Sequence, residues 1–298
     1  MAEAEARAGR RSGDPRRAAG PKPALLPIGG RPPLGVYINQ LAKRWPFALA
    51  QARAQAMTAN RGMILGNMWL VLNPLLDAAI YFLIFQVVLD IGDRTPNYIG
   101  YLLIGVFLYA MTSTAIAQST GIIRSNKGLI RAFAFPRAAL PLAMVTRSVL
   151  NAIPVIIVLL IILMANPPHA LPNVLWLLFP VVLALQTALN LGIAFVIARL
   201  SDALPDIGRA ISIGSRLLMY ASCVIFPDQR IRDLPGGNLI LEINPVFHVL
   251  DISRDLLIYE TMPEARSWLI LTAYAVGLLI FGFLYFWRGE VSYGRTTQ

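Results

Sequence analysis

The chain has 298 residues, of which 56% are hydrophobic and 14% are charged. Soluble domains are about one-quarter charged, so this composition excludes an ordinary soluble protein and predicts an all-α integral membrane protein. The formal net charge of +10 does not indicate a nucleic-acid partner, because 11 of the 26 Lys and Arg residues precede Trp69, in a tail and in a segment next to the first apolar run.

The first 62 residues hold a tail and an amphipathic segment. Residues 1–33 are rich in Ala, Arg, Gly and Pro, and we expect a disordered cytosolic tail. Residues 34–62 are expected to form an amphipathic helix at the membrane interface. Apolar side chains recur there at every fourth position: Tyr37, Leu41, Trp45 and Leu49. Pro46 either breaks this helix or begins a second one.

Six transmembrane helices are expected to follow, since about 20 apolar residues cross the hydrocarbon core. The apolar runs lie near 68–90, 98–120, 138–165, 173–199, 207–227 and 267–287. The fifth run is the least regular. Between the fifth and sixth runs, two apolar stretches at 239–241 and 246–250 are too short to span. We expect them to be short re-entrant helices on the external side.

The distribution of Lys and Arg orients these helices, because cytoplasmic loops carry an excess of both. Nineteen of the 26 lie on the side of the two termini and five lie on the other side, with Arg147 and Arg216 inside spans. Both termini, including a second short tail at 291–298, are therefore predicted to be cytosolic. The loop at 227–266 is predicted to be external, and it carries seven acidic residues.

The cytosolic loop from Arg124 to Arg137 is basic and amphipathic. Ser125 can cap a short helix, and Pro136 disfavours helix in the residue before it. The apolar face of that helix would hold Gly128, Leu129, Ile130 and Phe133. We interpret the segment as a helix shaped to fit a cleft in another protein. A basic loop that only fixes topology is the alternative, although such a loop does not need these apolar residues.

Three ionisable residues lie inside the predicted spans: Asp77, Arg147 and Arg216. Each is about nine residues, or roughly 14 Å, from the cytosolic end of its helix. Because charges inside spans rarely face lipid, we predict that Asp77 pairs with one arginine and that the other faces a channel. The alternative is that both arginines extend to the cytosolic headgroups, which would leave Asp77 without a partner.

The chain lacks the common motifs of catalysis and of nucleotide binding. None of its three lysines follows a glycine, so a Walker A motif is absent. The single cysteine, Cys223, and two distant histidines, His169 and His248, predict neither a disulfide framework nor a metal site. We therefore predict no catalytic residue, and energy for any transport must come from a partner or an ion gradient.

Three short motifs, in order along the chain, resemble those of ABC-2 type permeases, in particular exporters of O-antigen, teichoic acid and related cell-wall polysaccharides. The first comprises Leu65-Gly66, Trp69 and Leu72-Asn73-Pro74-Leu75. The second comprises Asn126, Leu129-Ile130, Phe135-Pro136-Arg137 and Pro141-Leu142. The third is Ile243-Asn244-Pro245. Each is weak alone, and together the resemblance covers about residues 36–290.

The resemblance implies a multi-pass protein of the bacterial plasma membrane, with 34–290 as its transmembrane domain. It implies a homodimeric channel with two separate ATPase subunits, which would bind the ATP and Mg²⁺, and no cofactor on this chain. The cargo would be a glycan on a polyprenyl pyrophosphate, of O-antigen, teichoic acid or galactan type. Residues 34–62 would be the gate helix, although relatives more often carry charged residues at Trp45-Pro46, which puts its continuity in doubt.

The resemblance also implies that the 124–137 helix couples the permease to its ATPase. The residues expected to act there are Arg124, Asn126, Leu129, Ile130, Arg131, Phe133, Phe135 and Arg137.

Two further residue sets are candidates for contact with the cargo. Four basic residues before the first span lie at headgroup level and would recruit the pyrophosphate: Lys43, Arg44, Arg53 and Arg61. Attraction to anionic lipid explains them equally well. Five aromatic residues could stack on sugar rings: Tyr81, Phe82, Phe85, Tyr220 and Phe226. Lipid-facing or core packing is the alternative for each.

Two other functions remain open. An ABC-2 exporter of a lipid or a drug would have the same fold, since the fold does not fix the cargo. A membrane glycosyl or phosphoglycosyl transferase would need a cytosolic metal-binding loop, for which only Asp202 and Asp206 are available.

Overall fold

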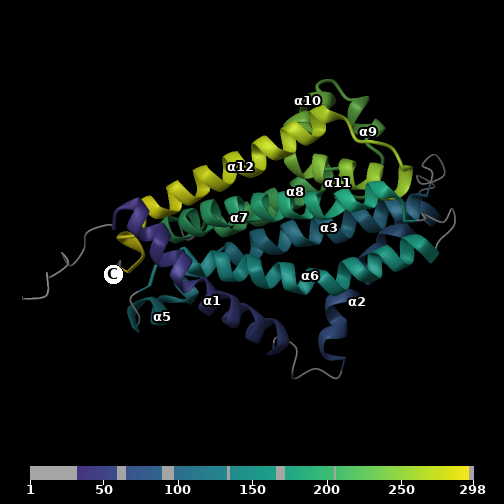
Figure 1. The fold of residues 1–298 in the computed structure, drawn as a ribbon. Helices are drawn as coiled ribbons and strands as arrows, with labels where there is room; N and C mark the ends of the chain where they lie inside the picture. Colours follow the sequence, from purple (N-terminus) through teal and green to yellow (C-terminus); the bar gives the residue numbers. More distant parts are fainter. Residues whose placement is uncertain are drawn as a thin grey trace, which may run out of the picture. The chain divides into compact units, whose positions relative to one another are not determined.

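A computed structural model describes residues 32–58, 65–88, 97–132, 135–165, 172–204 and 206–294. They belong to one compact unit that begins at Pro32. All the regular elements within these ranges are helical (Figure 1), which confirms the predicted all-α class. The expected tail, apart from Pro32 and Pro33, lies outside the described residues, as do residues 295–298.

Five helical segments are long and apolar enough to cross a membrane: Gly66–Val88, Tyr98–Ser119, Ala139–Ala165, Val174–Ala203 and Ala265–Arg288. The first joins a 3-10 turn, helix α2 (Trp69–Phe82) and a π-helical turn (Leu83–Val88). The others are α3 (Tyr98–Ser119), α6 (Ala139–Ala165), α7 (Phe179–Ala203) with the 3-10 turn Val174–Leu178 before it, and α12 (Ala265–Arg288). They coincide with the first four and the last of the predicted spans.

The fifth predicted span, 207–227, is shorter in the structure. Helix α8 covers only Ile207–Ala221, and Cys223 has a positive φ of 52°. The chain is not helical from 222 to 227 because side chains from other helices bind its carbonyl groups. Tyr98 Oη donates to Ile225 O at 2.7 Å, and Tyr101 Oη donates to Cys223 O at 3.0 Å. A continuous helix to residue 227 was thus a wrong prediction, and a sixth crossing stays a prediction.

Short helices occupy the region between α8 and α12, as expected. They are α9 (Gln229–Arg232), α10 (Gly237–Ile243) and α11 (Pro245–Arg254), followed by a π-helical turn at Asp255–Tyr259. Asn244 begins α11 as its cap, because its side chain accepts hydrogen bonds from the backbone of Val246 and Phe247. Arg254, at the end of α11, is 3% exposed and donates to Cys223 O at 2.9 Å.

The amphipathic segment forms one helix, α1 (Leu34–Thr58), which continues through Pro46. The predicted break is therefore absent. Pro46 is exposed and α1 packs against α6, so tertiary contact holds the helix together where proline removes a hydrogen bond. Of the predicted apolar stripe, Tyr37 is buried whereas Trp45 is 40% exposed.

Two buried clusters organise the unit. The larger one joins α3, α6, α7, α11 and α12. The smaller one includes Tyr37 of α1, Ile130, Phe195 and Phe286, and so joins α1, α7 and α12 to the cytosolic loop. Helices α7 and α12 approach each other so closely that a Cβ atom at Gly282 would collide with the Gly192 carbonyl oxygen. The absence of a side chain at Gly282 therefore permits this packing.

The elements predicted to be cytosolic and external lie at opposite ends of the helical bundle. Figure 1 shows α1, α5 and the end of α12 at one end, and α9 and α10 at the other. The orientation predicted from the basic residues requires this separation.

Candidate functional site

The basic segment consists of two short helices, α4 (Ile122–Ser125) and α5 (Lys127–Ala132). A short helix after Ser125 was the expectation, and α5 lies in that range; Asn126 separates it from α4. The Asn126 side-chain amide donates to Ile122 O at 2.8 Å, which competes with a continuous helical ladder. Ser125 is the last residue of α4, where its hydroxyl donates to Ile122 O at 3.1 Å, so it does not begin α5.

Helix α4 is fixed to the end of α7. Arg124 Nη2 donates to the Asp202 carbonyl at 2.8 Å, and Gly121 N donates to Ser201 Oγ at 3.0 Å. Arg124 therefore binds within its own chain. This bond holds α4 against the end of α7, and the coupling role of Arg124 stays a prediction.

The apolar residues of α5 face their own protein. Ile130 is 7% exposed and belongs to the smaller core cluster, against which Leu129 and Phe135 pack. Arg131 is exposed. Phe133 lies outside the described residues. Of the apolar face that was expected to meet a partner, Leu129 and Ile130 thus pack against their own chain, whereas Gly128 and Arg131 are exposed; contact with a partner stays a prediction.

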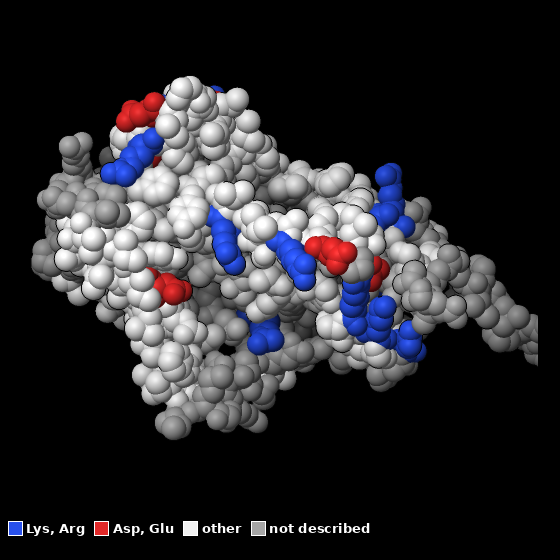
Figure 2. Space-filling view, turned by 180° about the vertical axis from the view of Figure 1, so that it is seen from behind, with Lys and Arg blue, Asp and Glu red and all other residues white. Residues whose placement is uncertain are grey.

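Basic side chains gather near α5. Figure 2 shows Lys and Arg atoms together at the end of the described part that holds α5 and the end of α12, with acidic groups beside them. On α1, Lys43, Arg44 and Arg53 are exposed, and Arg61 lies outside the described residues. The exposure of these cations on α1 is compatible with binding to headgroups, and that role stays a prediction.

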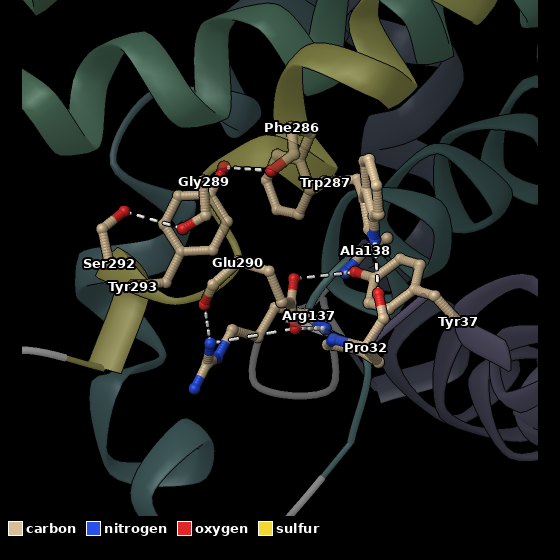
Figure 3. Close-up of polar contacts among 10 residues, drawn as sticks. All are labelled: Pro32, Tyr37, Arg137, Ala138, Phe286, Trp287, Gly289, Glu290, Ser292 and Tyr293. Carbon is tan, nitrogen blue, oxygen red and sulfur yellow. Dashed lines mark hydrogen bonds and ion pairs between the residues drawn. The ribbon is translucent and has the colours of Figure 1, made fainter. Parts of the chain in front are cut away.

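Arg137 ends the basic segment in a buried junction that the sequence did not reveal. Its backbone N–H donates to Glu290 Oε1 at 3.0 Å, and its guanidinium bonds the Glu290 carbonyl. Tyr37 Oη donates to Glu290 Oε2 at 2.8 Å (Figure 3). Burial raises the pKa of the Glu290 carboxyl above its ordinary value, and the bonds from Arg137 and Tyr37 oppose that rise.

The sequence held one indirect signal for this junction, which was not used to predict it. Glu290 is a lone carboxylate between Arg288 and Arg295, in a flank where positive charge accumulates. An acid there has no role in membrane topology, which suggests a buried partner.

A cavity of about 430 Å³, lined by both polar and apolar residues, lies between α2, α3 and α6. Asp77 of α2 and Arg147 of α6 both line it, so the structure brings together two of the three predicted intramembrane charges. Its other polar lining residues are Asn73, Ser113, Thr114, Gln118, Ser148 and Asn151. Arg147 Nε and Ser148 Oγ are buried without a hydrogen-bond partner. The polar side chains of the lining include both hydrogen-bond donors and acceptors.

The third intramembrane charge lies elsewhere. Arg216 is exposed on α8 and is not part of the cavity lining. Among the described residues no ion pair joins Asp77 to Arg147 or to Arg216. A direct pair with Arg147 thus stays a prediction, and the shared cavity makes it geometrically reasonable.

The five candidate aromatics do not line this cavity. Tyr81, Phe82 and Phe85 pack against the larger core cluster, and Tyr81 Oη contacts Met219 Sδ of α8 at 3.9 Å. Tyr220 is 49% exposed. Phe226 packs against the larger core cluster and against a third, small cluster of Cys223, Ile231, Leu241 and Phe247. Stacking on sugars remains a prediction for them.

Comparison with known proteins gives these features a context. Residues 48–258 match the model of a family described as ABC-2 type transporter. The chain is similar to the O-antigen export system permease protein RfbA of Myxococcus xanthus, with 26% identity over 74% of this chain and 83% of the relative.

Two further relatives are also similar to this chain over most of their own length. The O-antigen export system permease protein RfbA of Klebsiella pneumoniae is 28% identical over 78% of this chain and 89% of the relative. The polysialic acid transport protein KpsM of Escherichia coli is 25% identical over 73% of this chain and 83% of the relative.

Proposed function

The chain belongs to the ABC-2 type transporter family, and from this membership we propose that it is the membrane-spanning permease of a polysaccharide exporter. The observation that carries the proposal is the similarity, over about three-quarters of the chain, to permeases of O-antigen export and of polysialic acid transport. Those two cargoes share long chains of polyhydroxylated sugars, which points to a glycan here.

The polar residues of the cavity lining are compatible with this cargo. Sugars need hydrogen-bonding partners for their hydroxyl groups, and a buried polar group without a partner is costly. Asn73, Gln118 and Asn151 present amide groups around Asp77 and Arg147. Apolar residues such as Trp69, Phe107 and Val155 also line the cavity, so its lining alone does not separate a glycan from a lipid or a drug.

We further propose that transport is driven by a separate ATPase that binds near α4 and α5. This chain has no Walker A lysine, and Arg131 is exposed on α5 beside other basic side chains. Two copies of the permease and two ATPase subunits would form the transporter. The proposed substrate is a glycan on a polyprenyl pyrophosphate, which the exposed cations of α1 would attract at headgroup level.

Deletion of the gene in its host tests the cargo. We expect surface polysaccharide to disappear and lipid-linked glycan to accumulate in the cytosol, with both effects reversed by the wild-type gene. Unchanged surface polysaccharide, together with a new sensitivity to a lipid or a drug, would instead support the other ABC-2 cargo class.

A further inference from the structure

The C-terminal segment after α12 carries a carboxylate that binds two distant parts of the chain. Glu290 is 6% exposed. Its Oε2 accepts a hydrogen bond from Tyr37 of α1, and its Oε1 accepts one from the Arg137 backbone, at 2.8 Å and 3.0 Å. Arg137 Nη1 lies 3.8 Å from Oε1 as a further ion pair. Each carboxylate oxygen is thus committed to a different element (Figure 3).

Tyr37 closes the same network from the other side. Its hydroxyl oxygen accepts a hydrogen bond from Ala138 N at 3.1 Å while its proton goes to Glu290, and its side chain is 1% exposed. Trp287 Nε1 also donates to Pro32 O at 3.3 Å, directly before α1. The start of α1, the end of the basic segment and the end of α12 therefore share one buried set of bonds.

Separating these elements would leave several polar groups buried and unpaired. If α1 moved away alone, Glu290 Oε2 and Ala138 N would lose their partner together. If the basic segment moved alone, Glu290 would lose the Arg137 backbone donor. Because unpaired buried groups are costly and charge-assisted bonds are strong, joint movement is favoured over separate movement. Packing of the 3-10 turn Ser292–Gly294 against α5 adds a second connection.

We propose that Glu290 is a positioning residue that fastens α1 to the α4–α5 segment, so that the two move as one body. In the transporter, a displacement of α4–α5 by the ATPase would then move α1, the helix next to the headgroups. This last step rests on the proposed function, whereas the mechanical connection does not.

Spin labels test the connection in the permease alone. Labels at Gln40→Cys and Gly128→Cys report the distance between α1 and α5. Both positions are exposed, and a Cβ at Gly128 meets no atom within 4 Å. The native Cys223 is buried, so a sample without the two new cysteines measures its background. The full chain is studied in lipid nanodiscs by pulsed electron paramagnetic resonance.

The variants are Tyr37→Phe and Glu290→Gln, with Tyr293→Phe as the matched control. Tyr293 is an equally buried tyrosine, but its hydroxyl donates to Phe286 O at 2.8 Å, inside the C-terminal region itself. We expect a broader distance distribution for the first two variants and an unchanged one for the control. The double variant should be at least as broad as Glu290→Gln alone, because it also loses the bond from Ala138 N to Tyr37 Oη. Distributions as narrow as wild type in both single variants would overturn the proposal.

Coupling provides a second readout. In the complex with its ATPase, the ratio of glycan exported to ATP hydrolysed should fall about fivefold in Glu290→Gln, the effect of losing one typical hydrogen bond. A lower yield of folded protein would reduce both quantities and leave the ratio unchanged, and that result would contradict the positioning role. If the wild-type complex exports no glycan while the label distances respond as expected, the proposed function fails and the connection stands.

Discussion

Two charged residues share a cavity, and the third lies apart. The sequence placed Asp77, Arg147 and Arg216 at one depth, because helix rise converts residue number into depth. It could not give the direction in which each residue faces around its helix or the position of α8. The structure adds these: Asp77 and Arg147 line the cavity, while Arg216 is exposed on α8.

Charge exchange tests the relation between the two cavity residues. Asp77→Asn should destabilise the permease by about 1 kcal/mol, in the usual range for loss of a polar partner. Asp77→Arg combined with Arg147→Asp should recover part of the folded yield, measured by fluorescence-detected size-exclusion chromatography. The matched exchange with Arg216→Asp should recover none. Equal recovery in both exchanges, or a silent Asp77→Asn, would rule out the specific relation.

The environment of Asp255 predicts that the stability of the folded chain depends on pH. It begins the π-helical turn after α11, and burial, followed by the charges of Asp251 and Glu264, raises its pKa to about 7 from an ordinary 3.8. The folded chain therefore binds this proton more tightly than the unfolded chain does. The contribution of Asp255 to stability is complete below about pH 4 and decreases as the pH rises through 7.

The unfolding temperature of the wild type should accordingly fall between pH 5 and pH 8. Asp255→Asn should reduce this fall, because the amide does not titrate. Asp233→Asn serves as the control, since Asp233 is an exposed acid of the same loop. An identical pH dependence in wild type and Asp255→Asn would show that this carboxyl does not titrate in that range.

At the scale of the element, the basic segment shows what a sequence pattern can and cannot predict. Its basic, amphipathic and partly helical character follows from the residues. The break at Asn126 and the inward direction of Ile130 do not, because they depend on local amide bonding and on the neighbouring cluster around Phe195 and Phe286. Tertiary packing thus uses the apolar face that was expected to bind a partner.

Arg131 is the residue of α5 expected to contact the ATPase. Arg side chains are enriched among those that dominate binding energy, where loss costs more than about 1 kcal/mol. Arg131→Ala should therefore weaken ATPase binding by about fivefold or more, as measured by surface plasmon resonance on nanodisc-embedded permease. Arg288→Ala is the control, because Arg288 is also exposed but ends α12. An equal effect of both changes would indicate only a general effect of charge.

The position of helix α1 in the chain was predicted from the sequence, whereas its continuity through Pro46 was not. The packing of α1 against α6 is a tertiary effect that a local rule for proline does not contain. Substitution of the basic residues in and after this helix tests its proposed role in binding the pyrophosphate. Glutamine at Lys43, Arg44, Arg53 and Arg61 together should weaken binding of a pyrophosphate-linked glycan about tenfold or more.

The comparison is with anionic phospholipid retained by the same nanodiscs, measured by native mass spectrometry. Retained phospholipid should change less than glycan affinity. The reverse order would favour general attraction to the membrane, the alternative reading of these four residues.

At the scale of the whole molecule, five of the six predicted crossings correspond to long helices, because a run of about 20 apolar residues is a strong signal. The fifth does not, although residues 222–225 are apolar or small and buried. Tyr98, Tyr101 and Arg254 supply the hydrogen bonds that hold this stretch in a non-helical form. Hydropathy alone does not contain such long-range bonds.

The Glu290 junction could not be predicted for the same reason, since it too depends on long-range hydrogen bonds. Tyr37, Arg137 and Glu290 are far apart in the sequence, and only the folded chain brings them together. Family motifs marked the basic segment and the first span, whereas the buried carboxylate that joins the basic segment and α1 to the C-terminal region follows no motif. The structure therefore adds the connection between elements that the sequence had identified singly.

The central claim is that this chain forms the membrane path for a glycan and that a separate subunit supplies the energy. It is tested most directly in proteoliposomes that contain the permease with its cytosolic face outward, the ATPase subunit and a lipid-linked glycan. The measurement is the fraction of glycan protected from an added glycan hydrolase. We expect protection only when permease, ATPase and ATP are all present, and no ATP hydrolysis by the permease alone. ATP hydrolysis by the purified permease alone would contradict the account. Equal protection of the glycan in liposomes that lack the permease would contradict it as well.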